Sequence, residues 1–221
     1  MSEASHDCGI PVPSLQHRSF GIPDLAVSWV ALSVAGYLLY NSPLYALGGP
    51  LRIAAWENFI VIFLVLGPAF VLHEAMHIRT ARKLGKPAGF KLWPFGIFIM
   101  LITSIIGFLF ALPGATMIET DRRNQPALSE MGVIAIAGPL TNIILSLISG
   151  TVTGIGILIG NIFVVEAGLY SIGINAFLAG FNLLPVAILD GAKVYKWNKR
   201  LWAMFFFPSI VIGMFIMFTL F

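Results

Sequence analysis

The chain contains very little charge. Only 10% of its 221 residues are Asp, Glu, Lys or Arg, whereas 58% are hydrophobic. A soluble domain of ordinary composition carries roughly 25% charged residues, and so few charged side chains cannot cover a surface that faces water. Several apolar stretches also reach the roughly 20 residues that a helix needs to cross a bilayer. The sequence therefore predicts a membrane protein whose outer surface faces lipid.

The chain also lacks the features of several other protein classes. A single cysteine, Cys8, excludes an intrachain disulfide. The net charge of +3 comes from short basic clusters between apolar segments rather than from a basic stripe, so nucleic acid is not an expected partner. The first residues are polar and show no signal-peptide pattern. Residues 1–24 are predicted to form an N-terminal tail, and residues 25–221 a single transmembrane domain.

The order of apolar and basic segments predicts the topology. Apolar stretches lie at 25–47, 55–84, 95–113, 131–150, 162–188 and 201–221. The strongest basic clusters follow residue 78 and Asp190, and the positive-inside rule places both in the cytoplasm. An even number of crossings must separate them, so 95–113, which contains glycine and proline, is predicted to be a re-entrant or extended element. The predicted fold class is an all-α polytopic membrane protein with five transmembrane helices, or six if 95–113 crosses.

The most specific chemical signal is the sequence His73-Glu74-Ala75-Met76-His77. Two histidines four residues apart lie on one face of a helix, so both imidazoles can reach one zinc ion. In zinc hydrolases with this spacing, the glutamate acts as general base on metal-bound water. The alternative is a helix end with solvated side chains. However, His73 directly follows the apolar run 59–72, and ionisable groups at such depth are costly and usually functional.

A catalytic zinc ion normally has three protein ligands and one water molecule. Acidic residues near the apolar segments are few, and by the crossing count Glu57 and Glu166 lie toward the opposite membrane face. Asp190 follows the segment 162–188 at its cytoplasmic end, so Asp190 and His73 approach the same side. Asp190 is therefore the candidate third ligand, beside His73 and His77, for one Zn²⁺ ion per chain.

Three motifs in this order resemble those of the site-2 proteases, the zinc-dependent intramembrane proteases. They are the motif at 73–77, the run Ala137-Gly138-Pro139-Leu140-Thr141-Asn142, and the run Asn182-Leu183-Leu184-Pro185-Val186-Ala187-Ile188-Leu189-Asp190-Gly191. The resemblance covers a catalytic core at about 55–195 and indicates the compact prokaryotic or archaeal form. It implies the same three ligands, Glu74 as the catalytic base, and Asn142 and Asn182 near the site, where they place the substrate or stabilise the oxyanion.

Some features depart from the family pattern or allow a second interpretation. Family members often read HELGH, where this chain has Ala75-Met76 between Glu74 and His77, and Phe95–Ile118 is unusually apolar where the family often has a membrane-associated β region. Asn142 either makes an interhelical hydrogen bond or faces the site. Asn182 and Pro185 either bind substrate or form a helix kink in which the amide satisfies a freed carbonyl.

The function predicted from these features is intramembrane zinc metalloendopeptidase, which cleaves transmembrane segments of membrane-protein substrates, as in regulated intramembrane proteolysis. Glu74 accepts a proton from zinc-activated water and passes it to the leaving amine. The expected location is the cell membrane, with a multi-pass topology and the active site toward the cytoplasmic side. Alternatives are a metal transporter or metal sensor, a catalytically inactive relative, and a zinc protease acting on prenylated C-termini. The chain shows no inverted repeat of the transporter type.

Overall fold

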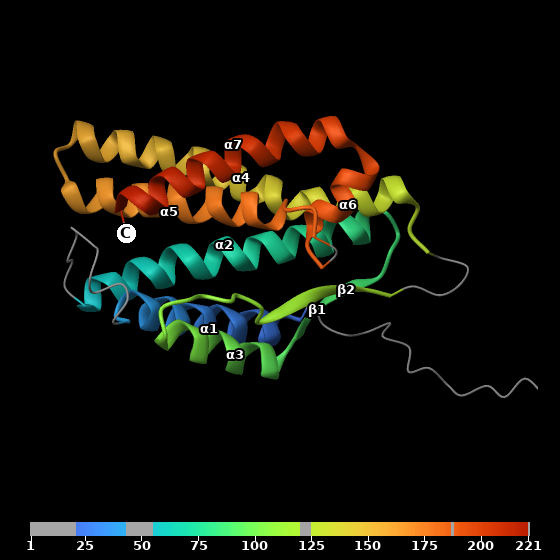
Figure 1. The fold of residues 1–221 in the computed structure, drawn as a ribbon, viewed down its shortest axis with the longest axis horizontal. Helices are drawn as coiled ribbons and strands as arrows, with labels where there is room; N and C mark the ends of the chain where they lie inside the picture. Colours follow the sequence, from blue (N-terminus) through green and yellow to red (C-terminus); the bar gives the residue numbers. More distant parts are fainter. Residues whose placement is uncertain (1–20, 43–54, 120–124, 187, 221) are drawn as a thin grey trace, which may run out of the picture.

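The computed structural model describes residues 21–42, 55–119, 125–186 and 188–220. Within these ranges the chain forms seven helices and one pair of strands (Figure 1). The elements in chain order are α1 (Ile22–Tyr40), α2 (Ala55–Lys83), β1 (Ala88–Leu92), α3 (Pro94–Ile105), β2 (Gly114–Ile118), α4 (Leu128–Leu158), α5 (Ile162–Asn182), α6 (Asp190–Trp197) and α7 (Lys199–Leu220).

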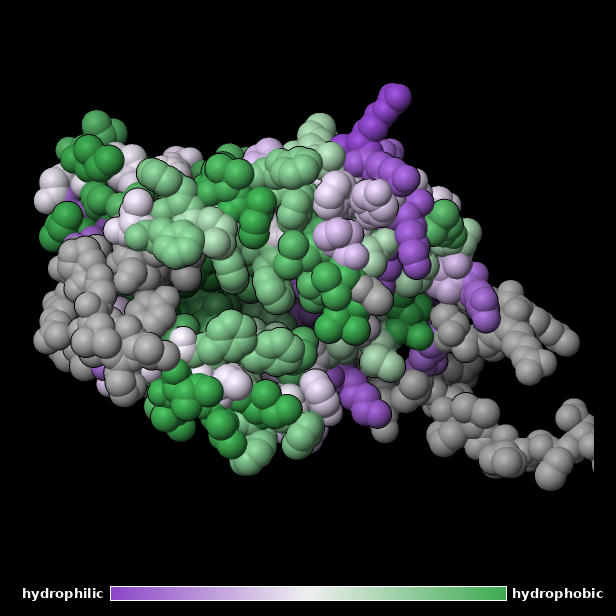
Figure 2. All heavy atoms as spheres, viewed as in Figure 1, coloured by the Kyte–Doolittle hydropathy of each residue, from purple (hydrophilic) through white to green (hydrophobic). Residues whose placement is uncertain are grey.

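Five helices of the described part are long and apolar enough to cross a membrane, namely α1, α2, α4, α5 and α7. The shortest of these spans, Lys199–Ile216, has 18 residues, which is about 27 Å of helix. Exposed Leu, Ile, Val and Phe side chains cover the sides of the bundle, whereas hydrophilic residues gather toward one end (Figure 2). The predicted all-α polytopic membrane fold is confirmed.

Helix α2 occupies the middle of the bundle. It contacts α1 on one side and α4 and α5 on the other, while α7 packs on α5 (Figure 1). Glycine permits close approaches between these helices, for example between α5 and α7, where a Cβ atom at Gly180 would lie 2.7 Å from the backbone nitrogen of Ile210. Small residues commonly bring membrane helices together in this way. The helix that carries the two histidines thus has other helices of the bundle on two sides.

The segment 95–113 does not cross the bundle. Helix α3 has 12 residues, or about 18 Å, which is too short for a ~30 Å hydrocarbon core. The segment also returns to the end from which it starts, because the Trp93 N–H donates to the Pro113 carbonyl over 2.9 Å. The predicted re-entrant or extended element is confirmed, and the alternative of a sixth crossing is wrong.

Strands β1 and β2 flank this element and form a two-stranded antiparallel sheet, with Phe90 opposite Thr116. The outer edge of β1 is tied to the bundle at two points. The Leu92 N–H donates to the Asp24 carboxylate of α1 over 3.1 Å, and the Arg82 guanidinium of α2 donates to the Ala88 carbonyl over 2.7 and 2.9 Å. The sheet is therefore held against α1 and α2 near the end of α2 that carries the histidines.

Two boundaries near the candidate site differ from the sequence prediction. Helix α5 ends at Asn182 rather than continuing to 188, because Pro185 has no N–H group to continue the helix. Asp190 then begins α6, where only a basic loop was expected. At the other end of the chain, α1 begins at Ile22, inside the range 1–24 assigned to the tail; residues 1–20 lie outside the described residues.

Candidate metal centre

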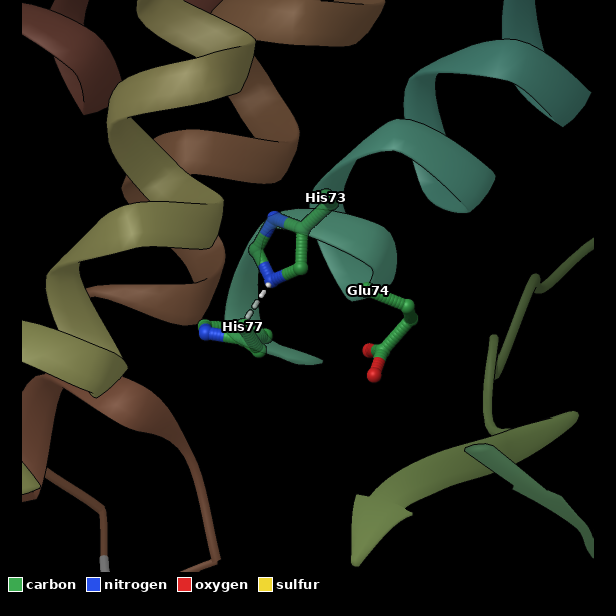
Figure 3. Close-up of side chains that lie close together, drawn as sticks. All are labelled: His73, Glu74 and His77. Carbon is green, nitrogen blue, oxygen red and sulfur yellow. Dashed lines mark hydrogen bonds between the residues drawn. The ribbon is translucent and has the colours of Figure 1, made fainter. Parts of the chain in front are cut away.

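Helix α2 presents its three motif residues in two directions. The His73 and His77 rings lie together, with their Nε2 atoms 3.0 Å apart, because residues four apart share one helix face. Both side chains are buried, with 5% and 7% of their surface exposed. Glu74 lies to one side of the pair, with its carboxylate toward strand β2 (Figure 3).

Asp190, the first residue of α6, completes this arrangement from a distant part of the chain. Its Oδ2 atom lies 3.3 Å from His73 Nε2 and 3.0 Å from His77 Nε2. Close packing after the end of α5 places α6 here, since a Cβ atom at Gly191 would overlap the Leu183 carbonyl. The structure therefore brings together the three residues that sequence analysis named as ligands, from positions 117 residues apart.

The second nitrogen of each imidazole has a protein partner. His77 Nδ1 lies 2.7 Å from the Ile134 carbonyl oxygen, which only accepts hydrogen bonds, so this Nδ1 carries the proton. His73 Nδ1 lies 2.6 Å from Asn142 Oδ1. If His73 donates in the same way, each neutral imidazole directs a lone pair on Nε2 toward the other and toward Asp190.

Backbone and side-chain contacts fix the orientation of the Asn142 amide. Its Nδ2 donates to the Ala69 carbonyl over 3.1 Å and to Asn175 Oδ1 over 2.9 Å. Asn175 Nδ2 donates in turn to the Ser171 carbonyl over 2.9 Å. The amide oxygen of Asn142 must therefore face the ring, and His73 must donate through Nδ1. A partner on the distal ring nitrogen is the usual way to orient a metal-binding histidine.

Three acceptors consequently converge on one point. Two imidazole lone pairs and a carboxylate oxygen repel one another unless a cation lies between them. Ligands around a tetrahedral zinc ion with bonds of 2.0–2.2 Å are about 3.3–3.6 Å apart, and the separations here, 3.0 to 3.3 Å, reach the lower end of that range. The donor set and its spacing fit a zinc ion.

The carboxyl group of Asp190 is suited to this role. Burial raises the pKa of this carboxyl, but the two neighbouring imidazoles lower it, and the net pKa lies well below the usual range. The ionised carboxylate is the form that binds a metal ion, and protons compete with the metal for the carboxylate and imidazole ligands. Metal binding is therefore expected to weaken as the pH falls.

A curated protein of Methanocaldococcus jannaschii, named "Putative zinc metalloprotease", is 38% identical to the chain over 166 residues, which are 72% of this chain and 82% of the relative. The chain belongs to the same zinc metalloprotease family. No family model and no solved structure matches the chain.

Three contacts of this zinc metalloprotease were not found by sequence reasoning. Asn175 supports Asn142, as described above. Lys193 Nζ lies 3.4 Å from Asp190 Oδ1, the oxygen turned away from the imidazoles. Thr116 of β2 donates to Glu74 Oε2 from its backbone N–H over 3.0 Å and from its hydroxyl over 2.7 Å. The spacing of Lys193, three residues after Asp190 on a helix, was the only local signal for any of them.

The two remaining predicted residues of the zinc metalloprotease lie at the end of α5. Asn182 Nδ2 donates to the Leu178 carbonyl over 2.9 Å, within its own helix, and Pro185 is exposed. This amide bonds one turn earlier in α5, whereas the carbonyl four residues before Pro185, that of Phe181, accepts from the Leu184 N–H over 3.1 Å. The roles of Asn142, Asn182 and Pro185 toward a substrate stay predictions.

Gly138 of α4 leaves the space that the metal needs. A Cβ atom at this position would overlap the Nε2 atoms of both His73 and His77. We predict that Gly138→Ala lowers the zinc affinity at least tenfold, measured by competition with a chromophoric chelator. Gly154→Ala on the same helix is the matched control, because a Cβ atom there meets nothing within 4 Å. Equal zinc affinity in the Gly138→Ala variant and the wild type would contradict the location of the site.

Proposed function

We propose that this zinc metalloprotease is an intramembrane endopeptidase of the site-2 protease type, which cleaves within the transmembrane segments of membrane-protein substrates. The observation that carries the proposal is the convergence of three acceptors inside a lipid-facing helical bundle. His73 lies ten residues before Lys83, the last residue of α2, which corresponds to about 15 Å along the helix. A bond cleaved at this depth lies in a segment that enters the membrane.

The side chains around the site can perform the proton transfers of peptide hydrolysis. Zinc bound by His73, His77 and Asp190 would polarise the scissile carbonyl and lower the pKa of a bound water molecule. Glu74 lies beside the ligands, with its carboxylate oxygen within 4.8 Å of the ligand atoms of the two histidines. It accepts a proton from the attacking water and delivers it to the leaving amine.

The substrate must present an extended backbone to these groups. A continuous helix keeps its carbonyl groups in internal hydrogen bonds and covers them with side chains. Cleavage is therefore expected where glycine, proline or polar residues weaken a transmembrane helix. Lipid surrounds the enzyme, and the substrate reaches the site from within that lipid.

The central test of catalysis is the Glu74→Gln substitution. The amide keeps the size of the side chain but cannot accept the proton, so cleavage of a model transmembrane substrate should fall by at least 10²-fold. Zinc content should stay equal to that of the wild type, because the three ligands are unchanged. Full cleavage by Glu74→Gln would remove this residue from the mechanism.

The same variant separates proteolysis from the alternatives of metal transport and metal sensing. A transport path needs polar sites that lead to the far face, whereas the described residues contain a single cluster of the kind that holds a metal ion. Zinc uptake into vesicles that persists in Glu74→Gln, without cleavage by the wild type, would favour a transporter.

We further propose that the site faces the cytoplasm in the cell membrane. The end of α2 and helix α6, which carry basic residues and the metal-site side chains, lie at the end of the bundle where hydrophilic residues gather (Figures 1 and 2), in agreement with the positive-inside rule. Cys8 is the only cysteine, so labelling of introduced cysteines in a Cys8→Ser background tests the orientation. Lys196→Cys should react from the cytoplasm, and Asn161→Cys, in the turn between α4 and α5, from the other side. The reverse pattern would contradict the proposed orientation.

A further inference from the structure

Strand β2 and the proposed base are directly connected. Thr116 makes two hydrogen bonds to the same oxygen, Glu74 Oε2, one from the backbone N–H (3.0 Å) and one from the hydroxyl (2.7 Å). The hydroxyl also lies 3.3 Å from the Glu74 carbonyl oxygen. No donor to the other carboxylate oxygen, Oε1, is found among the described residues, so Oε1 is the one left for proton transfer.

The register of the sheet explains why the backbone N–H is free for this contact. Trp93 donates to Pro113 and Glu119 donates to Pro87, which fixes the alternation of paired and unpaired positions along β1 and β2. Thr116, opposite Phe90, falls on an unpaired position, so its N–H points away from β1. The outer edge of β2 thus faces Glu74, while the outer edge of β1 is held by α1 and α2.

The contact with Thr116 meets a requirement of the site, which is that the Glu74 carboxylate stay off the metal ion. Glu74 is next to a metal ligand in the sequence, and its carboxylate is close enough to the two imidazoles to join them on one metal ion. A carboxylate on the metal would take the position that a catalytic zinc ion keeps open for water. Two donors on Oε2 hold the group at a distance, because hydrogen bonds to an ionised carboxylate are strong and directional.

We propose that Thr116 is a positioning residue that keeps the Glu74 carboxylate out of the metal coordination sphere and in place as a base. This inference rests on the proposed function, since it assigns a partner to the proposed base. It also couples the strand pair to catalysis, because the base is aligned only while β2 lies against α2. The two residues are 42 positions apart, and the contact therefore depends on the docking of the sheet.

The test uses the Thr116→Val variant, which has nearly the same shape and keeps the backbone N–H but lacks the hydroxyl donor. Cobalt(II) replaces zinc as a spectroscopic probe, because its visible absorption bands change when a carboxylate takes the place of water on the metal. Thr116→Val should show this spectral change, and its kcat for a model transmembrane substrate should fall roughly 10- to 100-fold with KM little changed. Thr116→Ser, which restores the hydroxyl, should recover both the spectrum and kcat.

Two controls separate this role from a general effect of substitution. Thr219→Val removes a hydroxyl that bonds only within α7, and it should leave the spectrum and kcat unchanged. In a Glu74→Gln background the Thr116→Val change should leave the cobalt spectrum unaltered, because no carboxylate is left to bind.

The outcomes also distinguish this inference from the proposed function. Absence of cleavage by the wild type would reject the proposed function, while the cobalt spectra would still report on Thr116. Wild-type cleavage with identical spectra and equal kcat in Thr116→Val would overturn the role of Thr116. A spectral change that persists in the Glu74→Gln background would overturn it as well, because the added ligand could not then be Glu74.

Discussion

The meeting of three acceptors at one point is the constraint on which the rest of the structure depends. The lone pairs of two imidazoles and the charge of Asp190 face one another at 3.0 to 3.3 Å, an arrangement that requires a cation. Helix α2 supplies two of the groups from one face, and α6 brings the third to the same place. Gly138 lets α4 lie close to the two histidines, because it has no side chain to fill the space beside their Nε2 atoms.

The surrounding helices and strands orient the side chains of this centre through hydrogen bonds. A backbone carbonyl of α2, at Ala69, fixes the amide of Asn142, and that amide fixes the protonated nitrogen of His73. On the other side of the motif, β2 holds the carboxylate of Glu74. The ligands are therefore oriented through α4, while the base is oriented through the strand pair. Family membership supports zinc metalloprotease chemistry in general, and the position of His73 ten residues inside the long apolar helix α2 is what favours the proposed membrane-embedded substrate.

Local sequence patterns and composition were sufficient for much of this picture. The scarcity of charge predicted the membrane fold, and the i, i+4 spacing predicted the pairing of His73 and His77. Counting crossings between basic clusters anticipated that the segment 95–113 turns back and that Asp190 lies on the side of His73. The contacts of Thr116 and Asn175 could not be found in this way, because they depend on the register of a strand pair and on how α4 packs against α5. Helix α6 was missed for a related reason, since eight residues next to a basic loop give a weak periodic signal.

The zinc K-edge X-ray absorption spectrum of the purified protein, compared with that of its Asp190→Ala variant, is the most direct test of the metal centre. The wild type should bind one zinc ion per chain, with imidazole nitrogens and carboxylate or water oxygens at about 2.0–2.2 Å. The variant should lose an oxygen ligand or bind zinc more weakly. A wild-type protein that binds no zinc, or a spectrum and zinc affinity that Asp190→Ala leaves unchanged, would contradict the three-residue centre.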